Sequence, residues 1–192
     1  MKTVYLIGDS IRCNVPGGYG PYVKEYLEGK ANVLQPSDNC RFTVFTFRGL
    51  QTWFKNLKAD DIDIIHWNNG LWDSVEFADG EPLLTKELYQ YYLVRIYKEM
   101  KRRFPNVRII FATSTHIVEE KYKYPFLRTN ARIDEYNQAA REVLEPLGVE
   151  IDDLCAVSTT FTTADYIDGK THFTEAAGRI LAEQVIKSLK LD

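Results

Sequence analysis

The stretch TVYLIGDS, residues 3–10, decides the fold of this chain. Residues 3–7 are β-branched, aromatic or aliphatic, which predicts a strand buried on both faces. Gly8, Asp9 and Ser10 are turn residues, so they end this strand. Ser10 therefore follows the carboxyl end of the first strand, which is where open α/β sheets bind their ligands.

The rest of the chain alternates between predicted strands and predicted helices. We expect strands at 32–34, 63–67, 107–112 and 149–151, and helices over 22–27, 50–57, 85–104, 133–147 and 173–189. Such alternation is typical of a parallel sheet covered by helices on both faces. We therefore predict one domain over residues 1–192. Its fold class is α/β: a three-layer α/β/α sandwich with a five-stranded, mostly parallel sheet of flavodoxin-like topology.

The composition narrows the possible functions. The 192 residues are 45% apolar and 13% aromatic, which is enough to form a buried core. A formal net charge of −3 argues against a nucleic-acid-binding protein, and no apolar run is long enough to predict a membrane span. Asp9 interrupts the apolar N-terminal stretch, so we expect no signal peptide.

The three cysteines, Cys13, Cys40 and Cys155, are odd in number and widely spaced. They match neither a disulfide framework nor the ligand spacing of a zinc site. Unpaired cysteines are typical of a reducing compartment, so we expect a cytoplasmic protein without a bound metal.

Two segments carry residue types that could perform nucleophilic catalysis. Ser10 follows the first strand, and His172 precedes the last predicted helix with Asp168 four residues before it. A neutral imidazole can take the proton of a serine hydroxyl, and a carboxylate fixes the tautomer of that imidazole. The alternative is that these residues only shape two loops. His66, inside an apolar strand, is expected in the core.

Candidate oxyanion donors follow the second and third predicted strands. Asn68 and Asn69 come directly after strand 63–67, and Gly49 precedes the helix predicted from residue 50. Together with the N–H of Ser10, these groups could receive a developing negative charge. Asparagine and glycine are also ordinary turn residues, so each of them alone is a weak signal.

Five stretches together resemble a known family. They are GDSI (8–11), Gly49, HWNNGLWD (66–73), DGKTH (168–172) and FTEAAG (173–178). These stretches are similar to the sequence blocks of the SGNH or GDSL-type hydrolases, and the resemblance covers nearly the whole chain. It implies Ser10 as the nucleophile, His172 as the base and Asp168 as the acid of a catalytic triad. It also implies oxyanion donors from Ser10, Gly49 and an asparagine.

The third block departs from the family pattern. The family has Gly-x-Asn-Asp, whereas residues 70–73 of this chain read GLWD, with Trp72 in the place of the asparagine. Asn68 or Asn69 must then supply the oxyanion amide. We expect Asn68, because an asparagine followed by Gly-Leu-x-Asp resembles a variant subgroup of the family.

The last block departs by one residue. The family has its aspartate three residues before the histidine, whereas Asp168 lies four residues before His172. Asp165 is therefore an alternative acid, and a main-chain carbonyl could also orient the imidazole ring.

The resemblance implies a serine esterase that hydrolyses carboxylic esters with a small acyl group through an acyl-enzyme. Acetyl esters on a carbohydrate or a similar alcohol are the expected substrates, with no cofactor, no metal, no nucleic acid and no membrane as partners. One alternative is a lipid-type acylhydrolase or thioesterase on the same fold. Another is a non-catalytic carbohydrate-binding relative with a decayed site.

Overall fold

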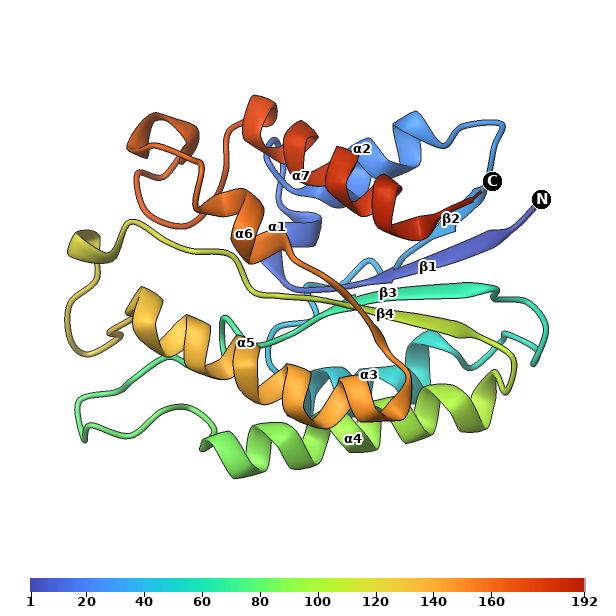
Figure 1. The fold of residues 1–192 in the computed structure, drawn as a ribbon, viewed down its shortest axis with the longest axis horizontal. Coiled ribbons are helices and arrows are strands. Elements are labelled where there is room, and N and C mark those ends of the chain that lie inside the picture. Colours follow the sequence, from blue (N-terminus) through green and yellow to red (C-terminus); the bar gives the residue numbers. More distant parts are fainter. Residues whose placement is uncertain (192) are drawn as a thin grey trace.

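The computed structural model describes residues 1–191 and shows one parallel sheet (Figure 1). Its strands are β1 (Thr3–Ile7), β2 (Asn32–Leu34), β3 (Ile64–Asn68), β4 (Arg108–Ala112) and β5 (Glu150–Asp152). They lie in the order β2-β1-β3-β4-β5, and every neighbouring pair is parallel. This is the flavodoxin-like order, so the predicted fold class is confirmed.

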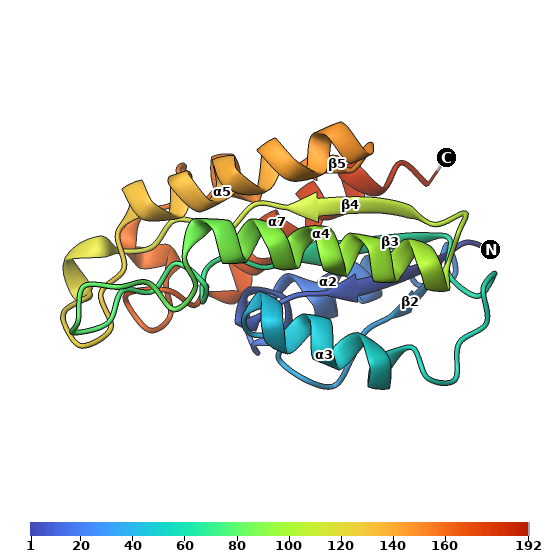
Figure 2. The same cartoon turned by 90° about the horizontal axis from the view of Figure 1, so that it is seen from below.

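Helices cover both faces of the sheet (Figures 1 and 2). The helices α2 (Tyr19–Tyr26) and α7 (Glu175–Leu189) lie on one face. The helices α3 (Thr43–Trp53), α4 (Lys86–Arg103) and α5 (Asn130–Leu144) lie on the other. Shorter segments are α1 (Ser10–Cys13), α6 (Leu154–Ser158) and the 3-10 turns η1 (Glu119–Lys121), η2 (Glu145–Leu147) and η3 (Thr163–Asp165).

The inner strand β1 contributes side chains to the cores on both faces of the sheet. Its side chains alternate, so Val4 and Leu6 pack in the core beneath α2 and α7. Tyr5 and Ile7 pack in the second core beneath α3, α4 and α5. All four are buried, which is why this segment reads as a continuous apolar run rather than an alternating one.

One predicted helix is wrong in its position. We expected a helix over 50–57, but α3 begins at Thr43 and ends at Trp53. The start of α3 is fixed by a contact from far along the chain. Asp73 accepts hydrogen bonds from the Thr43 backbone N–H (2.9 Å) and hydroxyl (2.7 Å). Most of the other predicted elements differ from the observed bounds by a few residues.

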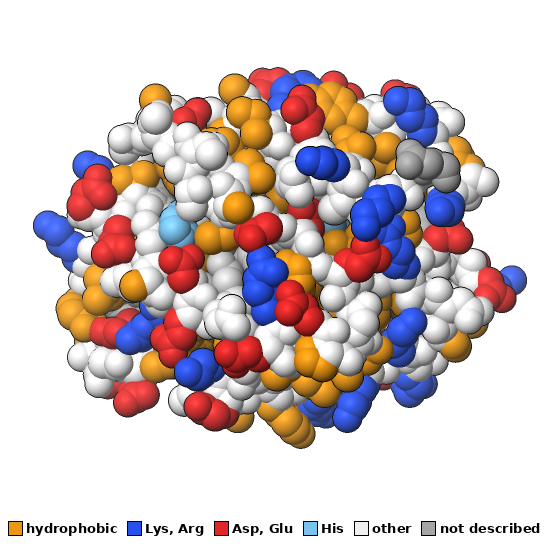
Figure 3. Space-filling view, viewed as in Figure 1, with side chains coloured by type: hydrophobic (Ala, Val, Ile, Leu, Met, Phe, Trp, Pro, Cys, Tyr) orange, Lys and Arg blue, Asp and Glu red, His pale blue; other side chains and the backbone are white. Residues whose placement is uncertain are grey.

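The parallel strands bring several loops to one edge of the sheet. The carboxyl ends of β1, β3 and β4 all face the left side in Figure 1, where the loops after them gather. On the face shown in Figure 3, acidic and basic side chains are interspersed. None of the helices within residues 1–191 combines the length and apolarity needed to cross a bilayer.

Candidate active site

Ser10 is the first residue of α1, directly after the turn that ends β1. Asp9 is the N-cap of this helix and accepts a hydrogen bond from the Ile11 N–H at 2.9 Å. The first N–H groups of a helix have no partner within it, so the Ser10 N–H is available to a ligand. The local fold thus presents both the hydroxyl and the N–H of one residue.

A buried arginine holds the turn that carries Ser10. Arg12 is 1% exposed, and its Nε donates to the Gly8 carbonyl at 3.2 Å. Its two Nη atoms donate to Gln35 Oε1 (2.8 Å) and to the Asp38 carbonyl (2.6 Å). These bonds tie the turn to the loop between β2 and α3, which restricts the position of the serine.

His172 lies between Ser10 and Asp168. Its Nε2 is 3.0 Å from Ser10 Oγ, and its Nδ1 is 2.7 Å from Asp168 Oδ2. With Asp168 ionised, Nδ1 carries the hydrogen and Nε2 is the acceptor for the serine hydroxyl. The structure therefore brings the three predicted residues into one hydrogen-bonded row, although they come from opposite ends of the chain.

The loop before His172 is built around the Asp168 carboxylate. Its Oδ1 accepts the backbone N–H groups of Lys170 (2.9 Å), Thr171 (2.7 Å) and His172 (3.0 Å). Burial acts to raise the pKa of Asp168, but these donors outweigh it and hold the pKa below its ordinary value. Gly169, with a φ of 68°, supplies the left-handed residue that the turn requires.

Asp165 has a different set of contacts. Its Oδ2 accepts hydrogen bonds from the Thr162 backbone N–H (2.8 Å) and hydroxyl (3.0 Å), and this pairing caps the turn η3. Of the two candidate acids, Asp168 is the one that contacts His172.

The Asn68 carboxamide lies between β4 and the turn that follows β1. Its Nδ2 is directed to the Ala112 carbonyl on β4 (3.4 Å). Its Oδ1 is turned toward β1, where a Cβ atom on Gly8 would lie 3.4 Å from it. An oxygen cannot donate a hydrogen bond to an oxyanion, so the expected preference for Asn68 does not fit this orientation.

The Asn69 carboxamide is held by hydrogen bonds at both its oxygen and its nitrogen. Its Oδ1 accepts the indole N–H of Trp67 at 2.7 Å, which fixes the rotation of the amide. Its Nδ2 then donates to the Arg41 carbonyl at 2.9 Å. Trp67 on β3 pairs with Ile7 on β1. Asn69 and Asp9, each two residues later in the chain, therefore follow neighbouring strand ends. Asn69 thus follows the strand end that adjoins the one carrying Ser10.

Gly49 does not lie at the start of a helix, where it was predicted. It is in the interior of α3, so its N–H follows the first turn and belongs to the helix. A Cβ atom there would lie 2.4 Å from the Trp53 ring, so the glycine makes room for that side chain. The prediction that Gly49 is an oxyanion donor is wrong, because the helix begins at Thr43.

Two buried carboxyl groups adjoin residues that line the pocket, since Asp9 precedes Ser10 and Asp73 follows Trp72. Burial raises the pKa of Asp9 and the pKa of Asp73 to about 6 each. One oxygen of each group has a donor, from Ile11 or Thr43, whereas each Oδ2 has no hydrogen-bond partner among residues 1–191. Both groups are therefore poorly solvated when they are ionised.

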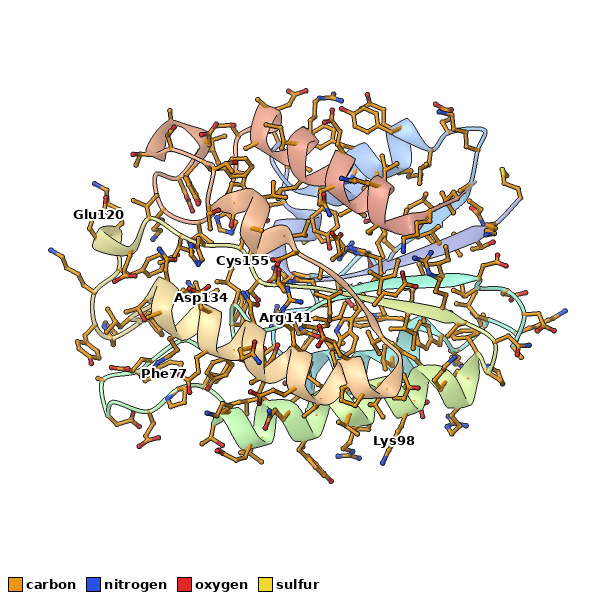
Figure 4. All side chains as sticks on the ribbon, in the orientation of Figure 1. Phe77, Lys98, Glu120, Asp134, Arg141 and Cys155 are labelled. Carbon is orange, nitrogen blue, oxygen red and sulfur yellow. The ribbon has the colours of Figure 1, made fainter. Side chains whose placement is uncertain are left out.

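A pocket of about 520 Å³ opens beside Ser10 and His172. Much of its lining is apolar or aromatic, with Phe77 and Phe126 in edge-to-face contact at 5.5 Å. The apolar and aromatic side chains that line it are Leu71, Trp72, Val75, Phe77, Leu83, Tyr122 and Phe126. Figure 4 shows Phe77 at the carboxyl edge of the sheet. The contribution of residues 121–128 was not predicted, because that loop has no motif of its own.

The other two histidines lie outside this pocket. His66 is fully buried and its Nε2 is 2.9 Å from Asp152 Oδ2, as expected for a core histidine. His116 Nε2 is 2.7 Å from Asp134 Oδ1, and Cys155 Sγ is 3.5 Å from the same oxygen. The donor atoms of these last three residues lie within 4.8 Å of one another, on segments that are distant in sequence. Figure 4 labels two of these residues, Asp134 and Cys155. Such donors suit a zinc-class ion, and sequence spacing could not show them.

No protein-family model and no curated protein sequence matches this chain. Solved structures do match it. A lipase/acylhydrolase from Enterococcus faecalis has a TM-score of 0.76 and 18% identity, covering 99% of this chain and 96% of that one. A lipolytic G-D-S-L family member from Veillonella parvula has a TM-score of 0.73 and 14% identity, covering 97% of each chain.

An acetylxylan esterase from Geobacillus stearothermophilus is also similar. It has a TM-score of 0.71 and 19% identity, covering 100% of this chain and 95% of that one. Catalytic mutants of that esterase, with a serine or a histidine replaced by alanine, match equally well. The chain therefore has the fold of the lipolytic G-D-S-L proteins and acetylxylan esterases, as its resemblance to the SGNH hydrolases predicted.

Proposed function

We propose that this chain is a serine esterase that hydrolyses carboxylic esters with a small acyl group. The observation that carries the proposal is the hydrogen-bonded row of Asp168, His172 and Ser10 beside an open pocket. A serine hydroxyl is a weak nucleophile by itself, and a neighbouring base oriented by a third group activates it.

The reaction follows from the direction of these hydrogen bonds. Ser10 Oγ attacks the ester carbonyl while His172 Nε2 takes the hydroxyl proton, and Asp168 stabilises the imidazolium. His172 then gives this proton to the departing alcohol, which leaves an acyl group on Ser10. A water molecule, deprotonated by His172, attacks the acyl-enzyme and releases the carboxylic acid and the free serine.

The oxyanion of each tetrahedral intermediate requires donors that are already oriented. We infer that the Ser10 N–H and the Asn69 Nδ2 supply them. The helix start favours the first donor. The second is favoured because the bond from Trp67 fixes the rotation of the Asn69 amide, and its Nδ2, which gives one hydrogen to the Arg41 carbonyl, has a second hydrogen to donate. Asn68 remains the alternative donor.

For the substrate, we propose acetyl esters of a carbohydrate or a similar alcohol. The acetylxylan esterases among the similar structures support this class, as do the aromatic side chains of the pocket. A lipid-type acylhydrolase is the second candidate, since Leu71, Val75 and Leu83 offer an apolar surface to a longer acyl chain. A series of nitrophenyl esters from acetyl to decanoyl separates the two by the acyl length with the highest kcat/KM.

Labelling with a fluorophosphonate probe tests the function itself, because the probe reacts only with an activated serine. We expect labelling of the wild type, loss of labelling in Ser10→Ala, and unchanged labelling in Ser37→Ala, which alters an exposed serine. A folded wild-type protein that is not labelled and hydrolyses none of the esters would overturn the proposal in favour of a binding protein with a decayed site.

A further inference from the structure

The charge of the pocket differs from that of the whole chain. Although the chain has a formal net charge of −3, four cationic side chains and one carboxylate line the pocket. The carboxylate is Asp168, which is bound to His172. The cations are Lys121, Lys123, Arg128 and Lys170.

These cations form no direct ion pairs, and the acid on which Arg128 acts at longer range is the buried Asp9. Within residues 1–191, none of the four forms a salt bridge with a carboxylate. Glu119 and Glu120 are on the same loop as Lys121, but Glu119 accepts the Asn130 N–H at 2.6 Å. Glu120 is exposed in η1, and it is not among the residues that line the pocket. The pocket therefore carries a local positive charge.

Arg128 is fixed in position relative to the catalytic histidine. Its Nε donates to the Leu71 carbonyl at 3.2 Å, and its Nη1 donates to the Tyr122 hydroxyl at 3.2 Å. The same hydroxyl is hydrogen-bonded to Thr171 Oγ1, and Thr171 directly precedes His172. This chain of contacts holds the guanidinium at a set distance from the reacting atoms.

Lys170 borders the same aromatic ring. Its Nζ lies 5.6 Å from the centre of the Tyr122 ring, and Arg128 Cζ lies 5.2 Å from it. The Lys170 backbone is also fixed, since its N–H donates to Asp168. Two cations near one ring repel each other, and an anion bound beside them would relieve that repulsion.

We propose that the natural ester carries an anionic substituent, a carboxylate or a phosphate, and that Arg128 and Lys170 bind this substituent. This inference rests on the proposed esterase function and names the substrate class of the same site. A guanidinium held by its Nε and Nη1 still presents Nη2, and its planar donors match the geometry of a carboxylate or phosphate. Positive charge in a cleft with apolar walls also raises the local concentration of anionic substrate.

Three acetyl esters with the same acetoxyphenyl group test the inference: 4-acetoxybenzoate, its uncharged methyl ester, and 4-acetoxyphenyl phosphate. Each kcat/KM is corrected for the rate of spontaneous hydrolysis. We expect the wild type to prefer an anionic ester over the methyl ester by about tenfold or more at low salt, the scale of one charge-assisted hydrogen bond. The preference should fall as NaCl is added. The ratio of the two anionic esters distinguishes carboxylate from phosphate.

Three variants locate the interaction. Arg128→Gln and Lys170→Gln should each reduce the preference for the anionic ester, and Arg128→Lys should retain part of it because the charge is kept. Lys98→Gln is the matched control: Lys98 is exposed on α4, away from Phe77 and the carboxyl edge (Figure 4). Its preference should equal that of the wild type.

The outcomes separate this inference from the esterase proposal. If the wild type hydrolyses charged and uncharged esters equally well at every salt concentration, the anion inference is overturned and the esterase stands. If no ester is hydrolysed, calorimetry of Ser10→Ala with 4-acetoxybenzoate and its methyl ester decides. The inference is supported if Ser10→Ala binds the anionic ester more tightly than the methyl ester and the double variant Ser10→Ala, Arg128→Gln does not. Equal binding of the two esters by Ser10→Ala overturns it.

Discussion

Gly17 and Gly178 pack against each other through their backbones: a Cβ atom on Gly178 would lie 2.4 Å from the Gly17 carbonyl oxygen. On the other side, a Cβ atom on Gly17 would lie 1.7 Å from the Phe173 carbonyl oxygen. This contact presses the loop after α1 onto the start of α7. Because that loop follows Ser10 and α7 follows His172, the contact helps to set the distance between the two reacting side chains.

The substitution Gly178→Ala should therefore disturb both stability and activity. We expect a loss of about 1–3 kcal/mol in the free energy of unfolding, as for overpacked sites, even after the gain in helix propensity. Turnover of the folded protein should also fall, because the two segments must separate. Ala176→Ser, at an exposed site on α7, is the control for both measurements. A wild-type melting temperature in Gly178→Ala would contradict the role of this contact.

The second prediction concerns the acid beside His172. Asp168→Asn should lower kcat by about 10⁴-fold, because the carboxamide favours the wrong imidazole tautomer. Asp165→Asn should leave kcat near the wild-type value and lower the melting temperature slightly, since it weakens the cap at Thr162. Ester kinetics and melting curves of both variants check this. A large kcat loss in Asp165→Asn alone would transfer the role to that residue.

The third prediction concerns the dependence of stability on pH. The pKa of Asp9 is raised by burial from 3.8 to about 6, so the folded state retains its proton where the unfolded state has lost it. This group therefore lowers the free energy of unfolding as the pH rises from about 4 to about 6. Two pKa units correspond to about 3 kcal/mol as an order of magnitude.

The variant Asp9→Asn removes this ionisation and keeps an oxygen for the Ile11 N–H. Relative to the wild type, its free energy of unfolding should thus increase from pH 4 to pH 7, as measured by urea denaturation at several pH values. Asp60→Asn, which alters an exposed carboxylate, should show no such increase. A constant difference between Asp9→Asn and wild type across this range would show that Asp9 stays ionised in the folded protein.

The parts of the fold that depend on local sequence could be predicted. Strand β1 is a short apolar run that ends in turn residues, and α7 has apolar residues at helical spacing, so neither depends on distant contacts. The roles of Ser10, His172 and Asp168 were implied by the resemblance of their sequence blocks to those of the SGNH hydrolases, and parallel strands place the ends of separate segments at one edge.

The parts that depend on distant contacts could not be predicted. The start of α3 is fixed by Asp73, thirty residues beyond Thr43, so the local pattern misplaced the helix and gave Gly49 a role that it does not have. Similarly, the burial of Arg12 depends on carbonyl groups of the β2–α3 loop. The positive charge of the pocket arises from two loops that meet only in the folded chain.

The last prediction distinguishes the two asparagines after β3. Asn69→Ala should lower kcat by about 10²–10³-fold with little change in KM, since an oriented donor acts mainly in the transition state. It should also lower the melting temperature, because the Trp67 indole N–H loses its acceptor. Asn68→Ala should change stability but leave the kcat of the folded fraction near wild type, because its Nδ2 faces β4. Kinetics and melting curves of both variants decide, and a large kcat loss confined to Asn68→Ala would assign the oxyanion donor to Asn68.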